Sequence, residues 1–250
     1  MSLSPIPRVL STFRRKRVQT LLMGGQACIL YGAAEFSRDV DLDVAVAPQN
    51  LARLRAALDE LEAEPVFFPA LSAAVLRRGH ACHFRCLAPD LRGLRVDVMS
   101  KLRGVESFAR IWKRRVVLDL PGVGPVAVMA LRDLVLAKKT QRDKDWPMVR
   151  RLIEADVARA PEKPGAVRVG FWLRECRTFE LLRDLSQRYP RLAARAATRR
   201  PALRATMGGD EPLTVRLLSE EEAQVRELDR CYWAPLRAEL EQWRRGRPLD

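Results

Sequence analysis

The feature that most constrains the fold is a ten-residue stretch, RDVDLDVAVA at residues 38–47, in which polar and apolar side chains alternate. Strict alternation is typical of a β-strand with one buried face, because successive side chains of a strand point to opposite faces. Asp39, Asp41 and Asp43 then share one face, and the apolar residues between them share the other. The sequence therefore predicts a strand with a buried apolar face and three carboxylates in a row on the opposite face.

The segments around this strand predict a small mixed sheet with a few helices. Further strands are expected over residues 18–23, 81–87 and 94–99, and a hairpin over residues 116–129, each bounded by Gly or Pro. A short helix is expected over residues 26–34. A longer one is expected after Asn50, which we take as its N-cap.

The sequence becomes almost entirely helical after about residue 130. Helical segments are expected over residues 131–157, 171–189 and 219–245, and Ser219 with Glu222 forms a candidate capping box for the last one. We therefore expect an α+β protein: a small mixed β-sheet domain over residues 1–128, followed by a C-terminal helical domain over residues 129–250.

Composition restricts the class of protein and its partners. The chain has 250 residues, of which 48% are hydrophobic, so it can bury a core. It has neither a membrane-spanning apolar run nor a secretory signal at its start, and we expect a cytoplasmic protein without a membrane partner. Its 45 Lys and Arg against 31 Asp and Glu favour an anionic partner such as nucleic acid or a nucleotide polyphosphate.

The segment HACHFRC at residues 80–86 holds both histidines and two of the five cysteines. Structural zinc sites usually take two separated ligand pairs on loops, whereas this segment is short and alternates like a strand. A plain β-strand is the favoured interpretation, and zinc is the alternative. The odd, scattered cysteines favour reduced thiols over a disulfide framework.

Carboxylates in a row on one strand indicate a cation site. They repel one another unless a cation lies among them, and Mg²⁺ or Mn²⁺ takes oxygen ligands and can also bind phosphate. Asp97 lies between Val96 and Val98 in another expected strand, and could supply a third carboxylate. Gly24-Gly25 ends an expected strand just before a helix, a turn that lets backbone N–H groups approach a phosphate. The alternative is the solvent-exposed face of an edge strand.

These residues together resemble the nucleotidyltransferase superfamily of the DNA polymerase β type. The stretch GGQACILYGAAEFSRDVDLDV carries a Gly-Gly turn, a spacer and Asp-x-Asp on a strand, with a further Asp on a later strand. Within that superfamily it is most similar to AbiEii-like toxin nucleotidyltransferases and their uncharacterised relatives. The resemblance implies Asp39, Asp41 and Asp97 as catalytic metal ligands and Gly24 and Gly25 as triphosphate contacts. It also implies Mg²⁺ or Mn²⁺ as the cofactor and a nucleoside triphosphate (NTP) as co-substrate.

Two registers of this motif are possible. The preferred one takes Asp39 and Asp41 as the metal pair, because the family spacings then fit without an insertion; Glu35 and Ser37 stand where the family has an arginine and a threonine. The other pairs Asp41 with Asp43 and takes Arg38 as the family's arginine. Ser37 and Arg38 are therefore both candidate nucleotide contacts.

The helical half adds two basic features. LRDLVLAKKTQRDKD resembles the helix that follows the catalytic domain in those families, which implies Lys138 and Arg142 as triphosphate contacts. On one continuous helix they would share a face with Asp145, and ordinary surface ion pairs are the alternative. Between Arg188 and Arg204 the chain has six arginines and no acidic residue, which could follow an RNA backbone or dock on a protein.

The expected function is metal-dependent transfer of a nucleoside monophosphate from an NTP to an acceptor hydroxyl, with tRNA among the candidate acceptors. The alternative is a catalytically weak, nucleotidyltransferase-like binding module of a toxin–antitoxin or phage-defence pair, with an antitoxin protein as partner. A third possibility is RNA binding through the arginines alone.

Overall fold

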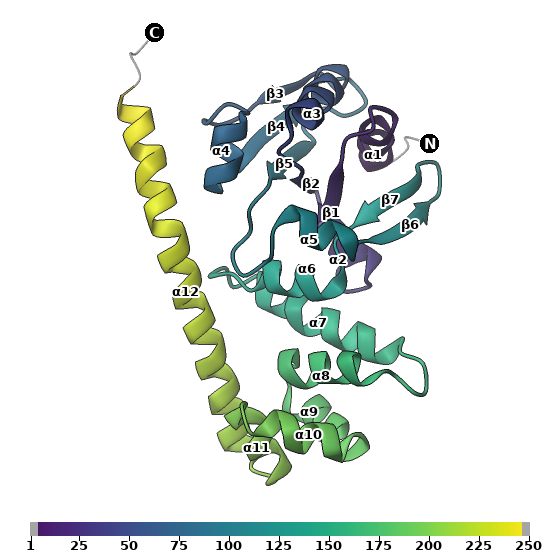
Figure 1. Cartoon of the computed structure of the whole chain (residues 1–250), viewed down its shortest axis with the longest axis vertical. Helices are drawn as coiled ribbons and strands as arrows, with labels where there is room; N and C mark the ends of the chain where they lie inside the picture. The colour runs from purple at the N-terminus through teal and green to yellow at the C-terminus, as the bar shows by residue number, and fades with distance from the viewer. Residues whose placement is uncertain (1–4, 247–250) are drawn as a thin grey trace. The chain divides into compact units, whose positions relative to one another are not determined.

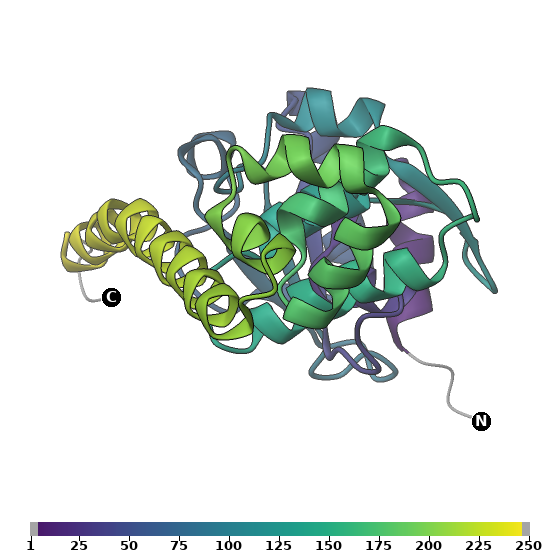
Figure 2. The same cartoon turned by 90° about the horizontal axis from the view of Figure 1, so that it is seen from below.

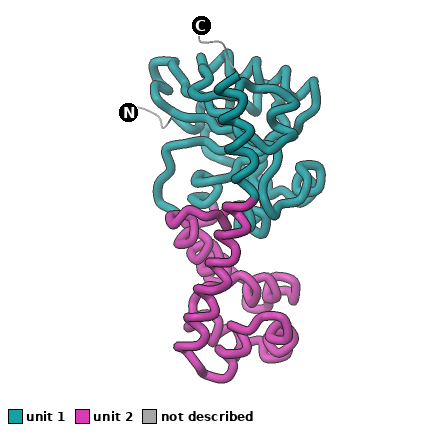
Figure 3. The backbone as a smooth tube through the Cα atoms, turned by 90° about the vertical axis from the view of Figure 1, so that its left-hand side faces the viewer, with its two compact units in different colours: residues 1–30, 34–137, 232–250 teal, residues 31–33, 138–231 magenta. Residues whose placement is uncertain are grey.

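The computed structural model describes residues 5–246, which divide into two compact units (Figure 3). Unit 1 comprises residues 1–30, 34–137 and 232–250, and unit 2 comprises residues 31–33 and 138–231. The sequence placed the boundary between residues 128 and 129; in the structure the change falls after Ala137, and the C-terminal residues belong to unit 1. Within residues 5–246, no helix is both long and apolar enough to cross a membrane.

Unit 1 is built on a mixed seven-stranded sheet (Figure 1). Its strands lie in the order β3-β4-β5-β2-β1-β7-β6. Their bounds are β1 Thr20–Met23, β2 Asp39–Val44, β3 Ala63–Pro65, β4 Cys82–Cys86, β5 Arg95–Met99, β6 Val116–Leu120 and β7 Gly124–Val128. Strands β5 and β2 are parallel, as are β1 and β7, and the other neighbours are antiparallel. The expected α+β class with a small mixed sheet and helices is confirmed.

Strand β2 has the predicted alternation. Val40, Leu42 and Val44 are fully buried, whereas Asp39 and Asp41 on the other face are half-buried. On the apolar side, Leu10 and Phe13 of α1 (Pro5–Arg15) border the same cavity as Leu42. Burial of the β-branched and leucine side chains there stabilises the sheet and fixes which face the aspartates take, since a one-residue slip would reverse the two faces.

Helix α3 (Pro48–Glu60) begins earlier than predicted. Its N-cap is Ala47, with Pro48 at the first helical position, so the assignment of Asn50 as N-cap is wrong. The buried Asn50 side chain instead accepts a hydrogen bond from the backbone N–H of Gln19 at 2.6 Å and donates to the carbonyls of Gln19 and Ala45. Asn50 therefore ties the start of α3 to the segments that flank β1 and β2.

The other helices of unit 1 are short, except for the part of α12 that belongs to it. They are α2 Gly24–Leu30, α4 Ala73–Arg78, α5 Phe108–Lys113 and α6 Leu131–Lys138 up to Ala137.

Helix α12 (Glu211–Arg245) contributes to unit 2 up to Cys231 and to unit 1 from Tyr232. The expected start of this helix at Ser219 is wrong: Ser219 lies inside it and donates to the carbonyl of Val215. Asp210 instead precedes the helix and accepts from the N–H of Leu213.

Unit 2 is helical, and α10 packs against α8, α9 and α11 (Figure 2). Its helices, besides the first part of α12, are α7 Asp145–Ala158, α8 Ala166–Glu175, α9 Phe179–Arg188, α10 Pro190–Ala197 and α11 Pro201–Met207. The expected helix over residues 131–157 is two helices, α6 and α7. Between them, the Thr140 hydroxyl accepts from the N–H of Arg142 and donates to Asp145, and such side-chain bonds compete with helical backbone pairing.

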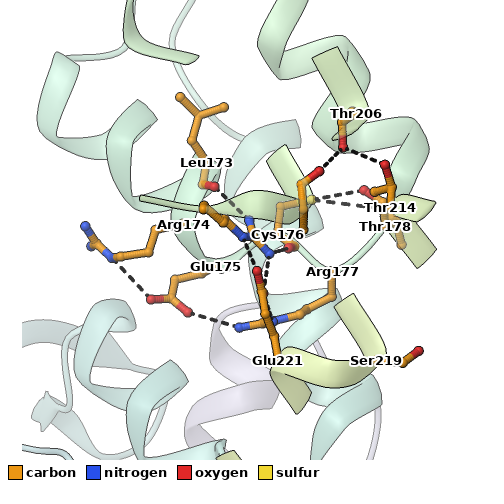
Figure 4. Close-up of polar contacts among 12 residues, drawn as sticks. Leu173, Arg174, Glu175, Cys176, Arg177, Thr178, Thr206, Thr214, Ser219 and Glu221 are labelled. Atoms are coloured by element: carbon orange, nitrogen blue, oxygen red, sulfur yellow. Dashed lines mark hydrogen bonds and ion pairs between the residues drawn. The ribbon is translucent and has the colours of Figure 1, made fainter. Parts of the chain in front are cut away.

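The expected helix over residues 171–189 is also broken, at residues 176–178. Buried Arg200 donates to the carbonyls of Leu173 and Cys176, both at 2.7 Å, so it satisfies groups at the end of α8 that a longer helix would have paired. Arg200 also pairs with Glu221 of α12. Arg177 pairs with the same carboxylate, and both Arg177 and Glu221 are labelled in Figure 4. The break therefore arises from a buried arginine that sequence periodicity does not show.

Candidate active site

Four residues form a row across the centre of the sheet in unit 1. Met23 of β1 pairs with Asp41 of β2, Asp41 with Asp97 of β5, and Asp97 with His83 of β4. Residues paired in this way have side chains on the same face of a sheet. Asp41, Asp97 and His83 therefore lie side by side, opposite the apolar face that holds Val40 and Leu42. The structure brings together the two strands that the sequence singled out for their aspartates.

The Gly24-Gly25 turn, where β1 ends and α2 begins, lies directly against Asp41. The N–H of Gly25 donates to Asp41 Oδ2 at 3.3 Å, and a Cβ added at Gly24 would meet the same oxygen at 1.8 Å. Gly24 has a φ of +64°, which glycine adopts without strain. A Cβ at Gly25 would in turn meet the hydroxyl oxygen of Ser37 at 2.4 Å. Glycine at both positions is thus required for Asp41 and Ser37 to lie where they do.

Asp39 lies one row from Asp41 and pairs with Arg95 across the parallel strands. Residues two apart on a strand project from the same face about 6–7 Å apart. Ser37 donates to the backbone carbonyl of Asp39 at 3.3 Å. Asp39 and Asp41 are therefore two half-buried carboxylates on one face, next to the Gly24-Gly25 turn.

Asp97 differs from Asp39 and Asp41 in its partners. Its Oδ2 accepts from the guanidinium of Arg95 at 2.9 Å, and its Oδ1 lies 2.8 Å from Nδ1 of His83. Only 14% of the side chain is exposed. A partly buried carboxylate paired with a guanidinium has its charge balanced within the protein. In this conformation Asp97 is oriented by Arg95 and His83.

Asp43, the third acid of the strand, is buried. Its exposure is 2%, and its Oδ1 has no hydrogen-bond partner among the described residues. Burial raises the pKa of this carboxyl to about 7, because the charged form loses its hydration there. The accessible acids of β2 are thus Asp39 and Asp41, which favours the register that pairs these two over the one that pairs Asp41 with Asp43.

The carboxylates on this face of the sheet are suitable ligands for a hard divalent cation, but they do not form a complete site. Carboxylate oxygens from Asp39 and Asp41 are the ligand type that Mg²⁺ and Mn²⁺ take, and the set contains no thiol. Within residues 5–246, however, no group of three or more His, Cys, Asp and Glu side chains is placed as a ready metal cluster. For Asp97 to join Asp39 and Asp41, its carboxylate would have to turn away from Arg95.

The remaining predicted nucleotide contacts have other partners. Exposed Arg38 lies over the ring of Phe36, with its guanidinium carbon 5.6 Å from the ring centroid. Lys138 and Arg142 belong to unit 2, where both bind Asp145 of α7, at 3.2 and 2.7 Å. Burial opposes ionisation of Asp145, but these cations and Thr140 outweigh it and lower its pKa. The single helix face expected for them is wrong, and their role as triphosphate contacts stays a prediction.

The segment at residues 80–86 forms strand β4 and its approach, as favoured from its alternation. Cys82 and Cys86 are buried on one face, and burial raises the pKa of both thiols to about 11. His83 projects on the other face, toward Asp97. His80 pairs with Glu239 at 2.7 Å. Because these side chains diverge, the segment does not form the zinc site considered as the alternative.

Sequence reasoning missed two residues of the site, Arg95 and His83. Arg95 could have been found, since it lies two residues before Asp97 and therefore on the same strand face. His83 could not, because its position beside Asp97 depends on the register between β4 and β5, which the turn sequence alone does not specify.

Comparison with known proteins adds only distant similarities. No family model and no curated protein matches the chain. Two solved structures from H. pylori are similar to it at 14% identity each. A candidate nucleotidyltransferase matches 89% of this chain and 92% of its own with a TM-score of 0.39. JHP933 matches 92% of this chain and 93% of its own with a TM-score of 0.37. Similarities of this size assign neither a family nor an activity to the chain.

Proposed function

We propose that the chain is a metal-dependent nucleotidyltransferase, which moves a nucleoside monophosphate from an NTP to an acceptor hydroxyl. The observation that carries this proposal is the pairing of Asp41 with Asp97 on parallel strands, with Asp39 on the same face and the Gly24-Gly25 turn against Asp41. Three carboxylates converging from two strands beside a glycine turn suit phosphate chemistry better than a solvated strand face, which would leave their repulsion unbalanced.

Each residue has a distinct role in the proposed reaction. Asp39 and Asp41 would hold divalent cations, which supply charge neutralisation of the triphosphate when bound. The backbone N–H groups of Gly24 and Gly25 would orient the triphosphate, the N–H of Gly25 after it leaves Asp41 Oδ2, because a glycine turn admits a phosphate close to the backbone. Asp97 would complete the binding of the cation on the acceptor side, orient the acceptor hydroxyl and take its proton as the new bond to the α-phosphorus forms. The bond from that phosphorus to the bridging oxygen breaks, and pyrophosphate leaves.

For the acceptor we propose a cytoplasmic RNA, with tRNA as the first to test. In unit 2, Arg191 and Arg195 are exposed on α10, four residues apart and thus on one helix face. Arg199 lies past the end of α10, and Arg200 is buried in its ion pairs, so only part of the segment from Arg188 to Arg204 presents arginines on this helix face. Arginines on one face can follow a phosphate backbone, and their removal should weaken binding and reduce its salt dependence.

One observation favours a second candidate function, a binding module with weak catalysis. The carboxylate of Asp97 is already held by Arg95 and His83, which compete with any cation for its oxygens. Such a module would bind a nucleotide or an antitoxin protein in a toxin–antitoxin or phage-defence pair. A module of this kind should show no metal-dependent heat when it is titrated with an NTP.

The test is transfer of label from each NTP, labelled at the α-phosphate, to RNA and protein of a cell extract in the presence of Mg²⁺. We expect labelled product from the unaltered protein and none from Asp41→Asn. Asp119→Asn, at an exposed position on β6 of the same sheet, is the matched control and should transfer normally. Equal transfer by the unaltered protein and Asp41→Asn would overturn the proposal, and transfer by neither would favour the binding module.

A further inference from the structure

A pocket of about 350 Å³ lies in unit 1 between the start of β4, the loop before α4 and the last turns of α12. Its lining includes Phe67, Phe68 and His83 from the sheet side, and Trp233, Arg237 and Arg244 from α12. A volume of this size is at the lower end of pockets that hold small organic ligands. The pocket therefore has room for one compact ligand.

The wall formed by α12 is fixed by specific contacts. Glu239 pairs with both Arg78 and the buried His80, the latter at 2.7 Å. The ring of Trp243 contacts those of His80 and Phe68, with centroids 4.9 and 6.0 Å apart. Because these contacts hold α12 from both charged and aromatic sides, the pocket is a preformed feature of unit 1.

The lining of the pocket combines aromatic rings with guanidinium groups. Phe67 is 51% exposed and contacts the ring of His83 at an interplanar angle of 81°, with 5.9 Å between centroids, so part of the Phe67 ring is exposed for contact with a ligand. Arg237 and Arg244 are exposed, and no carboxylate within residues 5–246 pairs with either. None of the lining residues is acidic. Stackable rings beside uncompensated guanidinium groups suit a ligand with an aromatic ring and an anionic group.

The pocket shares a residue with the candidate active site. His83 lines it and also lies 2.8 Å from Asp97 Oδ1, on the row that continues to Asp41. A ligand in the pocket would therefore lie on the Asp97 side of the aspartates, whereas the Gly24-Gly25 turn lies at Asp41.

We propose that this pocket binds a nucleoside monophosphate unit of the acceptor, with its base against Phe67 and its phosphate at Arg237 and Arg244. This inference rests on the proposed function, because it assigns the acceptor to the side of Asp97. The same unit is present in a free nucleoside monophosphate and at the end of an RNA chain.

The test is calorimetric titration of the full-length protein, without divalent cations, with each of the four ribonucleoside monophosphates, at up to about 1 mM. The corresponding nucleosides and inorganic phosphate are the comparison probes. We expect one of the monophosphates to bind more tightly than its nucleoside and than phosphate, since the rings and the guanidinium groups both contribute. Heat from inorganic phosphate alone, or from none of the monophosphates, would overturn the proposal.

Three variants locate the binding. Phe67→Ala should weaken the affinity about tenfold, within the range of base–aromatic stacking. Arg244→Gln should weaken it about fivefold, as expected for one exposed charge pair. Arg245→Gln makes the same change on the next residue of α12, outside the pocket, and should leave the affinity unchanged.

Binding by Phe67→Ala and Arg244→Gln equal to that of the unaltered protein would overturn the proposal. Both positions are exposed, so neither substitution should unfold the protein. Circular dichroism of each variant checks that it is folded.

Two further measurements complete the test. The first separates this proposal from the proposed function, and the second identifies the source of the nucleotide. Asp41→Asn should retain monophosphate binding while it loses nucleotide transfer. Monophosphate binding in a protein that transfers nothing would support the pocket and contradict the enzyme. Short single-stranded RNA with a free 3′ end that competes for the pocket would indicate an RNA terminus, and its failure to compete would indicate a free nucleotide.

Discussion

Gly24 leaves the space that the carboxylate of Asp41 occupies. A Cβ at Gly24 would lie 1.8 Å from Oδ2 and 2.4 Å from Cγ of Asp41, well inside contact distance. The strand pairing fixes the backbone on both sides, since Met23 is opposite Asp41. The turn and the acid are therefore coupled: a change at Gly24 moves the carboxylate on which the proposed function depends.

Gly24→Ala should abolish most activity at modest cost in stability. The left-handed backbone at this position costs roughly 1–2 kcal/mol for a residue with a Cβ. Displacement of the Asp41 carboxylate by about 1 Å should lower nucleotide transfer about a hundredfold. Denaturant unfolding and the transfer assay measure the two effects separately.

Gly93→Ala is the matched control, because Gly93 also has a positive φ, +88°, but an added Cβ there would meet no described atom within 4 Å. It should show a similar loss of stability with full transfer. If Gly24→Ala and Gly93→Ala retain equal activity, the coupling between the turn and Asp41 has no functional role.

Arg95→Gln should raise the affinity for Mg²⁺ in the presence of NTP. Arg95 donates to both oxygens of Asp97, and its removal frees Oδ2 to bind a cation, while Oδ1 keeps its contact with His83. A partly exposed pair of this kind contributes up to about 1 kcal/mol, so the gain should be about fivefold. Titration of Mg²⁺ at fixed NTP measures it. An unchanged Mg²⁺ affinity would show that Asp97 is not a metal ligand and that Arg95 and Asp97 form a structural pair.

Asp43→Asn should stabilise unit 1 at alkaline pH and change little at pH 4. Burial raises the pKa of Asp43 from 3.8 in the unfolded chain to about 7 in the folded state. The contribution of Asp43 to stability is therefore full below the unfolded pKa. It is lost as the pH rises through the folded pKa, because the carboxyl then ionises in its buried site. The stability gap between variant and unaltered protein should therefore widen between pH 4 and pH 8, to at most about 4 kcal/mol. Urea unfolding in EDTA at both pH values measures the gap, and Asp119→Asn should show none. A gap that is constant with pH would contradict the burial of an ionisable Asp43.

Asp145→Asn should destabilise unit 2. Asp145 is 1% exposed and accepts from Lys138, Thr140 and Arg142, so its loss leaves the buried Lys138 ammonium without a balancing charge. Breaking a buried pair in this way costs about 3–5 kcal/mol. Thermal unfolding compared with Asp143→Asn, whose side chain is exposed and pairs with Arg226, measures the effect. Equal melting of the two variants would contradict a structural role for Asp145.

How far the sequence predicts this molecule depends on whether a feature is local. Alternation in residues 38–47 predicted β2 and its two faces, because the period of a strand is visible in the sequence and burial enforces it. The hairpin β6–β7 was predicted for the same reason, with Pro and Gly marking its turn. The helix breaks at Thr140 and at Cys176 were not predicted, since they depend on hydrogen bonds from Thr140 to Asp145 and from Arg200 to the carbonyl of Cys176, which form only in the folded chain.

In the candidate site, too, the local features were predicted from the sequence and those that depend on the folded chain were not. Asp39, Asp41 and the glycine turn were chosen from local spacing, and the structure places the turn against Asp41. The partners of Asp97 and the burial of Asp43 depend on strand register and on what covers each side chain, which one sequence does not reveal. The part of α12 that carries Trp233 and Trp243 packs beside His80 through contacts across more than half of the chain, so its place was also beyond prediction.

The most direct test of the central claim is calorimetric titration of NTP into the protein with Mg²⁺ and then with EDTA, for the unaltered chain and Asp41→Asn. If Asp39, Asp41 and Asp97 form a nucleotidyltransferase site, the unaltered protein should bind NTP with a heat that EDTA abolishes, and Asp41→Asn should show no such heat. The same metal-dependent heat from both proteins, or from neither, would contradict the account.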